Sequence, residues 1–164
     1  MVDEEYMEMC LTEARAAWTK EEVPVGALVT DETGAIISRA HNMTRTLTDP
    51  GAHAEMIALR DAASSRGNYR LTGCTLFVTM EPCVMCAGAI IEARIERLVF
   101  GCHDDRRGAF GSIIDVNTLP LNHKVNVAGG ILEDKSALLL KQFFTIRRGT
   151  EVAITGPTRN RLYV

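Results

Sequence analysis

The sequence has no long hydrophobic run and no surplus of basic residues, and both absences narrow what the protein can be. A membrane-spanning helix needs about 18 or more apolar residues in succession, and no stretch of the chain approaches that length. The net charge of −3 lacks the basic character that usually marks a nucleic-acid-binding surface, although it says nothing about a local basic patch. The acidic start, Met-Val-Asp-Glu-Glu, precedes no apolar segment of signal-peptide type. We therefore expect a cytoplasmic protein with no membrane partner.

An internal repeat, a low-complexity tract and an interdomain linker are also missing. A chain of 164 residues that is 46% hydrophobic and 24% charged fits one compact domain with a single core. No clear pattern follows Gly149. We predict a domain over residues 1–148 and a tail over 149–164 to which no role is assigned.

The number of cysteines is odd, which argues against a disulfide framework. The five are Cys10, Cys74, Cys83, Cys86 and Cys102. In a reducing compartment, cysteines that serve a function more often bind metal or take part in catalysis. Metal binding or catalysis is therefore the better interpretation.

The spacing of apolar residues predicts alternating strands and helices. Helices are expected over residues 4–20, 53–65, 82–94 and 133–148, the last with apolar Leu138, Leu139, Phe143 and Ile146. Strands are expected over 25–30, 35–39, 74–79, 97–101 and 124–127, and the first two flank a Gly-containing turn. The Gly-rich segment 102–120 is expected to be a loop or lid. This order predicts an α/β fold: a mixed sheet of about five strands with helices on both faces.

Cys83 and Cys86 stand three residues apart, and their pattern has several interpretations. They could be a thioredoxin-like redox pair, or simply small buried residues. They could also be half of a tetrahedral zinc site, because residues i and i+3 share a helical face and a helix N-terminus favours thiolates. Pro82 is suited to be the first residue of that helix. The small run Ala87-Gly88-Ala89 would let the helix pack closely.

His53 and Glu55 also open a predicted helix, about thirty residues before the cysteines. Three protein ligands, His53 with the two cysteines, would leave zinc's fourth position for water, which is the catalytic arrangement. Residues i and i+2 do not face each other on a regular helix. Glu55 could point at that water if His53 lies at the helix edge. A structural site with a fourth ligand stays open, and its candidates are His41, Cys74, Cys102 and His103.

Together, His53-x-Glu55 and Pro82-Cys83-x-x-Cys86 form the signature of zinc-dependent base deaminases. More narrowly, the chain resembles the bacterial tRNA-specific adenosine deaminases of the cytidine/deoxycytidylate deaminase superfamily. The matching segments include EVPVGALV (22–29), HN (41–42), DPGAHAEMIAL (49–59), TLFVTMEPCVMCAGAII (75–91), GAFGSIIDV (108–116) and QFFTIRR (142–148). The resemblance covers about residues 4–148 and implies a three-layer α/β/α cytidine-deaminase-like fold.

The resemblance implies a hydrolase that converts adenosine to inosine at the wobble position of a tRNA anticodon and releases ammonia. His53, Cys83 and Cys86 would bind one Zn²⁺ per subunit, which makes hydroxide available at neutral pH. Glu55 would take the proton from water and pass it to N1 of the purine, while hydroxide attacks C6. The resemblance also implies a homodimer in which each site uses some residues of the partner.

The same resemblance assigns substrate contacts. The base would be held by Asn42 and the backbone around Ala54, with Val25 lining the pocket; by itself, Asn42 would be a turn residue. The anticodon stem-loop would be held through a ribose hydroxyl, an apolar contact and backbone phosphates. The residues expected there are Asp104, Phe144, Arg106, Arg107, Arg147 and Arg148. Taken alone, such arginine pairs are most often solvated surface.

Two other functions fit part of the pattern. A deaminase of the same fold that acts on a free base or nucleotide, such as guanine or deoxycytidylate, would share the zinc motif. The helix that ends in Arg147-Arg148 and the 102–116 loop favour tRNA. A zinc-stabilised binding module or inactive pseudo-enzyme would have no need of Glu55, so that residue discriminates between them.

Overall fold

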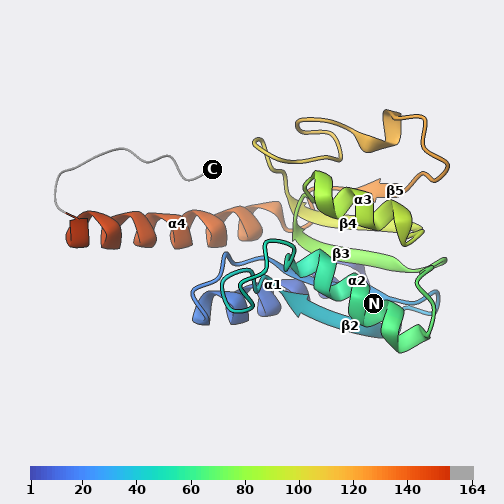
Figure 1. The fold of residues 1–164 in the computed structure, drawn as a ribbon, viewed down its shortest axis with the longest axis horizontal. Helices are drawn as coiled ribbons and strands as arrows, with labels where there is room; N and C mark the ends of the chain where they lie inside the picture. Colours follow the sequence, from blue (N-terminus) through green and yellow to red (C-terminus); the bar gives the residue numbers. More distant parts are fainter. Residues whose placement is uncertain (156–164) are drawn as a thin grey trace.

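The structure, a computed structural model, describes the backbone of residues 1–155 and the side chains of residues 1–149. Its elements follow the predicted order (Figure 1). The helices are α1 (Asp3–Thr19), α2 (Ala54–Arg66), α3 (Val84–Glu92) and α4 (Glu133–Thr155), with a 3₁₀ turn, η1, over Val116–Thr118. The strands are β1 (Gly26–Thr30), β2 (Ile36–His41), β3 (Thr75–Met80), β4 (Arg97–Cys102) and β5 (Asn126–Ala128). Every predicted helix and strand is present.

The strands form one mixed sheet in the order β2-β1-β3-β4-β5. β1 runs antiparallel to β2 and β3, whereas β3, β4 and β5 are parallel. The register pairs Gly26 with His41 and Ala27 with Val78, and Val78 pairs in turn with Phe100. β2, β3 and β4 therefore end at the same edge of the sheet, and the three loops that follow them leave it together. This is the edge at which ligand sites form in α/β sheets.

Helices cover both faces of the sheet. Side chains alternate along β3, so Leu76 and Val78 belong to the core under α2 and α3, while Phe77 packs with Tyr6 and Met7 of α1. The rings of Tyr6 and Phe77 have centroids 4.6 Å apart. α2 and α3 lie side by side on one face, and α1 and α4 contact the other (Figure 1). The predicted three-layer α/β/α architecture is confirmed.

Two glycines in the left-handed region let the chain change direction, and the first lies in the predicted turn between the first two strands. In the turn between β1 and β2, Gly34 has φ 85°, and the Asp31 carboxylate accepts hydrogen bonds from the backbone of Thr33 and Ala35. Gly67, with φ 60°, ends α2. Residues with a Cβ enter this region at a cost, which is why glycine marks both reversals in the sequence.

α4 packs against the sheet through its first part. Its buried side chains are Ser136, Leu140 and Phe143, which recur every three to four residues. Phe143 meets Trp18 edge to face, with ring centroids 5.5 Å apart, and so ties α4 to the end of α1. Within residues 1–155, no helix, α4 included, has both the length and the apolar character that crossing a bilayer requires.

The last helix is present as predicted, but its end lies later in the chain. Of its predicted apolar residues, Phe143 is buried, whereas Leu138 and Ile146 are 54% and 60% exposed. The helix also continues past residue 148 to Thr155. Its second part projects beyond the sheet, so the spacing of buried apolar residues does not mark where the helix ends (Figure 1). The predicted boundary at residue 148 thus falls within α4, and residues 156–164 of the predicted tail lie outside the described residues.

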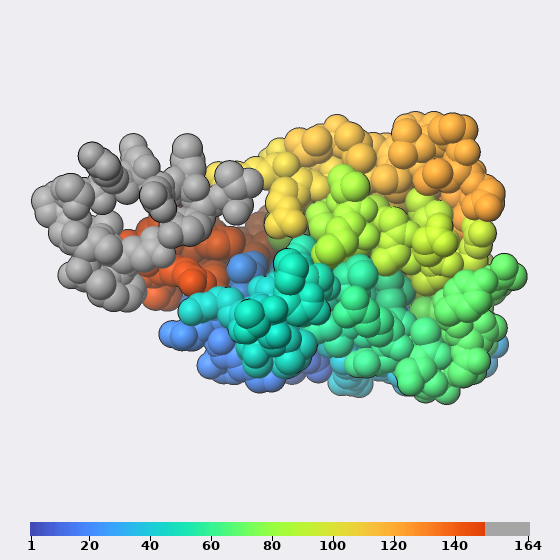
Figure 2. Space-filling model, in the orientation of Figure 1, coloured from blue at the N-terminus to red at the C-terminus, as the bar shows by residue number. Residues whose placement is uncertain are grey.

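The segment between β4 and β5 is the loop that the sequence predicts, apart from the 3₁₀ turn η1. It follows the outer side of α3 in the ribbon and on the molecular surface (Figures 1 and 2). A hydrogen bond from the Ala109 N–H to the Pro82 carbonyl and a bridge between Cys83 and Gly108 fix its first part beside the start of α3.

Candidate metal centre

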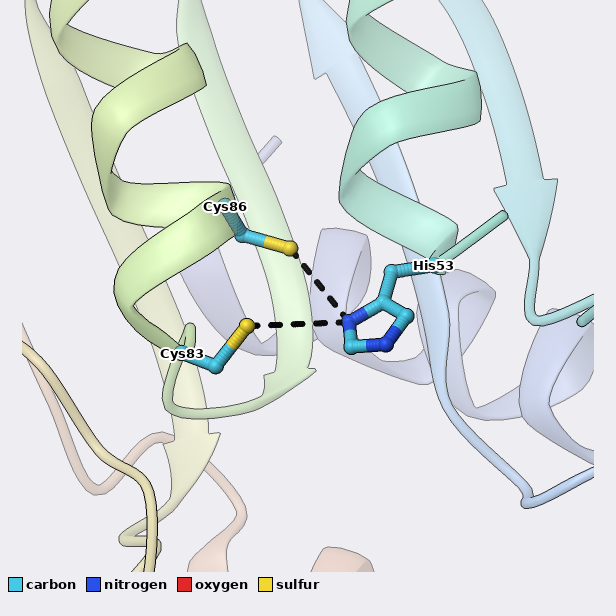
Figure 3. A group of neighbouring side chains, drawn as sticks. All are labelled: His53, Cys83 and Cys86. Carbon is cyan, nitrogen blue, oxygen red and sulfur yellow. Dashed lines mark hydrogen bonds between the residues drawn. The ribbon is translucent and has the colours of Figure 1, made fainter. Parts of the chain in front are cut away.

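Three side chains converge where α2 and α3 begin. His53 is the N-cap of α2, Cys83 is the N-cap of α3, and Cys86 lies in the first turn of α3. All three point toward one another, with Nδ1 of His53 facing both sulfurs (Figure 3). This nitrogen lies 3.7 Å from Sγ of Cys83 and 3.5 Å from Sγ of Cys86. The arrangement follows from the sheet, because the loops before both helices leave it at the same edge.

The spacing of these atoms fits zinc. A nitrogen and a sulfur at zinc's usual bond lengths, about 2.0 and 2.3 Å, lie about 3.5 Å apart when they subtend a tetrahedral angle. The ligand atoms of His53, Cys83 and Cys86 all lie within 4.8 Å of one another. One imidazole and two thiols are also the soft, mixed donor set that zinc prefers. The predicted gathering of these three residues is confirmed.

The two thiols have opposite acid–base properties. The hydrogen bond from Cys86 lowers the pKa of the Cys83 thiol to about 3, and His53 acts in the same direction. Burial acts in the opposite direction and is outweighed. The hydrogen bond with Cys83 and burial raise the pKa of Cys86. Cys83 is therefore a thiolate at neutral pH, which is the form that binds metal.

The four residues considered as a fourth ligand lie elsewhere. In the described part of the chain, the group of possible ligands holds three residues and no more. The candidates have other neighbours: Glu13 for His41, Glu133 for His103, Arg66 for Cys74, and the hydrophobic core for Cys102. All five cysteines are free thiols, so none forms a disulfide. Three protein ligands leave one tetrahedral position for another molecule.

One expectation about the start of α3 is wrong. Pro82 is not the first helical residue, because Cys83 has extended backbone angles (φ −76°, ψ 175°) and is the N-cap. The expected close packing of the small run is found at Ala87, which is fully buried, and at Ala89, which packs against the core. Gly88 takes no part in it, since nothing lies within 4 Å of where its Cβ would be.

Glu55 lies in the first turn of α2, buried beside the three donors. It is 4% exposed, and burial is the main reason why its pKa is raised. His53 and both cysteines are close enough to act on the same carboxyl. This proximity arises because His53 has extended backbone angles (φ −72°, ψ 152°) and lies outside the regular helix, as the sequence argument required.

The residues expected to hold a base are brought together, although they also bind one another. The Ala54 N–H donates to Oδ1 of Asn42 at 2.8 Å, and the Asn42 N–H donates to the carbonyl of Val25 at 3.1 Å. The Ala54 amide is therefore engaged within the protein. The side-chain amide group of Asn42 is its remaining donor.

Of the residues expected to contact RNA, three lie in the loop after β4. Arg106 and Arg107 are exposed. The hydrogen bond with Cys83 raises the pKa of the His53 imidazole, and Arg107 is near enough for its charge to oppose that rise. Asp104 is only 9% exposed, and its Oδ1 accepts hydrogen bonds from the backbone of Arg106 and Arg107. This loop is thus beside the metal centre.

The other three residues expected to contact RNA lie on α4, far along the chain from the three metal-binding residues. Phe144 is 42% exposed and Arg148 is exposed. The Arg147 guanidinium lies 5.8 Å from the centroid of the Phe143 ring, so it also makes a cation–π contact with a neighbour on the same helix.

Sequence reasoning missed two buried carboxylates that hold loops around the site. Glu22 is fully buried and accepts hydrogen bonds from Thr44 and Thr46, in the loop after β2. Glu81 is 2% exposed and holds the loop after β4. The sequence held a signal for Glu81 only, because an acidic residue directly after a buried strand is unusual unless it has hydrogen-bond partners.

Known proteins resemble this chain in sequence. The profile of the cytidine and deoxycytidylate deaminase zinc-binding region matches residues 1–102. The tRNA-specific adenosine deaminase of Haemophilus influenzae is 44% identical over 147 residues, which cover 89% of this chain and 85% of that protein. The protein of the same name from Bacillus subtilis is 42% identical over 87% of this chain and 88% of its own length.

Solved structures agree. One, from a study of A-to-I editing by tRNA:A34 deaminases at the wobble position, is 43% identical with a TM-score of 0.80, over 82% of this chain and 98% of that chain. A guanine deaminase from Nitrosomonas europaea is 26% identical with a TM-score of 0.74, over 88% and 85% of the two chains. The profile match, the identities and the donor set lead to one conclusion. This chain belongs to the cytidine and deoxycytidylate deaminase family and, within it, to the tRNA-specific adenosine deaminases.

Proposed function

We propose that this protein deaminates the wobble adenosine of a tRNA anticodon to inosine and releases ammonia. The observation that carries the proposal is the open group of His53, Cys83 and Cys86 with the buried Glu55 beside it. Relatives that are 42–44% identical over most of the chain are named tRNA-specific adenosine deaminases, which supports the proposal. A tRNA substrate also implies that the protein works in the cytoplasm.

His53, Cys83 and Cys86 would hold the zinc ion. When bound, zinc lowers the pKa of a coordinated water to about 7 and so supplies hydroxide at neutral pH. The chain contributes rigidity, because two of the three ligands are N-caps of packed helices. Ligands that are fixed in this way keep one coordination position open for substrate chemistry.

Glu55 would move the protons. Burial raises its pKa, which makes the carboxylate a stronger base that can accept the proton from water and then pass it to N1 of the adenine. The water oxygen becomes bonded to C6 and the C6–N6 bond breaks. Of the two protons lost by water, one stays on N1 of the inosine and the other leaves with the amino group as ammonia. Adenosine and water are thus converted to inosine and ammonia with no other reactant.

Asn42 and Val25 would position the base, and the loop after β4 would hold the adjoining nucleotide. The side-chain amide group of Asn42 is a donor at the pocket, since its oxygen is engaged with Ala54. Asp104 would contact a ribose hydroxyl, a group that distinguishes RNA from DNA. A loop nucleotide can be turned out into such a pocket for a few kcal/mol at most.

Five side chains, all exposed except the half-buried Arg147, would contact the anticodon stem-loop. They combine one apolar ring with positive charge, which suits an unstacked base and its phosphates. The set consists of Phe144, Arg106, Arg107, Arg147 and Arg148.

A homodimer is supported by the outward face of α3. Val84 and Met85 are 61% and 39% exposed there, and Gly88 adds no charge to the face. Ile113 and Ile114, 55% and 42% exposed, lie in the loop that hydrogen bonds place beside the start of this helix. Adjoining exposed apolar side chains of this kind are typical of a surface that another chain covers. A second copy would cover them next to the metal centre.

The alternative is a deaminase of a free base, because the guanine deaminase of Nitrosomonas europaea shares the fold at 26% identity. The test is to incubate the zinc-loaded protein with an anticodon stem-loop that carries a wobble adenosine, and separately with adenosine, guanine, cytidine and deoxycytidylate. We expect ammonia and inosine from the stem-loop. Ammonia from the free compounds alone would exclude the tRNA function. A matched stem-loop with guanosine at the wobble position controls for contaminating activities.

A further inference from the structure

Glu81 holds the loop that follows β4. It lies directly after β3, two residues before Cys83, and is 2% exposed. Its carboxylate accepts backbone hydrogen bonds from Asp104 at 3.0 Å, Phe110 at 3.0 Å and Ser112 at 3.1 Å. The Ser112 hydroxyl donates a fourth hydrogen bond. One side chain thus fixes both ends of the segment 104–112.

The middle of the same segment rests on this carboxylate. A Cβ on Gly108 would lie 2.4 Å from the Glu81 carboxyl, so the loop passes over it with no space for a side chain. The backbone N–H of Gly108 donates to the Asp104 carbonyl, which closes the turn. The close approach shows that the loop is built around Glu81.

A chain of hydrogen bonds connects Glu81, through Asp104, to the two arginines of the loop. The Asp104 N–H is bound by Glu81, and Oδ1 of Asp104 binds the N–H groups of Arg106 and Arg107. The position of the carboxylate therefore sets the position of Asp104, and Asp104 sets the direction in which both arginines leave the loop. None of these contacts involves the three metal-binding side chains.

We propose that Glu81 positions the loop over residues 104–112. It fixes Asp104, Arg106 and Arg107 at the place where the nucleotides that flank the target base would bind. This inference rests on the proposed function, because those nucleotides belong to an RNA loop. A carboxylate suits the role since it only accepts hydrogen bonds, and all four groups that face it are donors. The role is separate from catalysis, because Glu81 does not touch the reacting atoms.

Glu81→Gln tests the proposal, since glutamine keeps the size but turns an N–H₂ group toward the backbone donors. We expect full zinc content and at least tenfold faster hydrogen exchange at the amides of residues 104–112. The KM for the stem-loop and its dissociation constant should rise at least tenfold, whereas kcat falls less than threefold. A merely structural role would lower the melting temperature without this division between KM and kcat.

Tyr6→Phe is the matched control for lost stability. It removes the hydrogen bond from the Tyr6 hydroxyl to the Gly34 carbonyl, at the opposite edge of the sheet. It should lower the melting temperature and leave KM unchanged. In the double variant with Asp104→Ala, the effect of Glu81→Gln on KM should largely disappear, since the two substitutions act on the same contact.

The outcomes separate the two proposals. Wild-type protein that does not bind the stem-loop would overturn the proposed function. Normal stem-loop affinity and KM in Glu81→Gln, with or without faster loop exchange, would overturn the role of Glu81 and leave the deaminase activity as it stands. Equal KM changes in Glu81→Gln and Tyr6→Phe would also overturn it.

Discussion

Nδ1 of His53 faces Sγ of Cys83 across 3.7 Å, and each of these residues is the N-cap of its own helix. The positive ends of two helix dipoles therefore point at one spot, which favours a thiolate there. An N-cap also has a fixed backbone, so both side chains start from positions that packing determines. The metal centre is as rigid as the α2 and α3 layer that carries it.

Loss of one donor should abolish zinc binding. We expect Cys83→Ala to reduce zinc from one ion per chain to nearly none, because two remaining ligands cannot hold it tightly. The melting temperature should then no longer rise when zinc is added. Elemental analysis and calorimetry measure both effects. Cys102→Ala, a buried thiol outside the group, is the control and should retain zinc.

Removal of the proton carrier should stop the reaction and leave the centre intact. Glu55→Gln keeps the shape of the side chain but cannot accept a proton, so kcat should fall by about 10²–10⁴-fold. Zinc content and stem-loop affinity should stay at wild-type values. Single-turnover deamination of a stem-loop measures the loss. Wild-type rates in this variant would refute the assigned mechanism.

The stability that Glu22 gives to the folded protein should be lost in acid. Burial raises its pKa, but the hydrogen bonds from Thr46, Arg45 and Thr44 together outweigh burial and leave the pKa lowered. A lowered pKa in the folded state gives stability that is complete above the unfolded value of about 4.5 and is lost as the pH falls through the folded value.

Glu22→Gln should therefore reduce the free energy of unfolding at pH 7 by about 1–3 kcal/mol. The difference from wild type should shrink as the pH falls from 5 toward 3. Thermal unfolding across that range measures it. A difference that stays constant over these pH values would contradict the assigned ionised carboxylate.

The exposed ring on α4 should contribute to RNA binding. We expect Phe144→Ala to weaken stem-loop binding by about fivefold or more, as the loss of one apolar contact to a base would. The melting temperature should change little, since the side chain is 42% exposed. Leu138→Ala is the control, because this residue is 54% exposed on the same helix. Fluorescence anisotropy with a labelled stem-loop compares the two; equal effects would remove Phe144 from the interface.

A charge on the outward face of α3 should separate the proposed dimer. Gly88→Glu introduces it where a Cβ meets nothing within 4 Å, so the fold of each chain should be retained. Light scattering should show the mass of two chains for wild type and of one for the variant. Gln142→Glu adds the same charge on α4 and should leave the mass at two chains. A Gly88→Glu protein with unchanged mass would show that this face is not the interface.

The metal centre could be predicted from the sequence because its information is local. In His53-x-Glu55 and in Cys83-x-x-Cys86 the functional residues are only two or three positions apart, so each motif is visible in the sequence. Each also follows a loop or strand that is recognisable in the sequence. The sheet order that brings them together follows from the alternation of strands and helices. What sequence spacing suggested about Pro82 was wrong, because a helix can begin one residue later at the ligand itself.

The loops around the centre could not be predicted in the same way. Glu81 meets Phe110 across 29 residues, and no periodicity encodes a hydrogen bond over that distance. The buried face of α4 was predicted only in part: Phe143 was named, but Ser136 and Leu140 are buried while the apolar Leu138 is exposed. Such burial depends on the angle at which the helix crosses the sheet.

The order of the chain has a consequence for how this scaffold can change. Every residue assigned to the metal and its proton carrier lies before residue 102, within the part that the deaminase profile matches. The residues proposed for the flanking RNA all come after it, in the loop after β4 and on α4. The groups proposed to touch the flanking RNA are thus separate in the chain from the metal ligands and Glu55, although Glu81 in the first stretch holds the loop in place. We expect that substitutions of exposed side chains in the final third can change which molecule is bound while the residues assigned to the reaction stay the same.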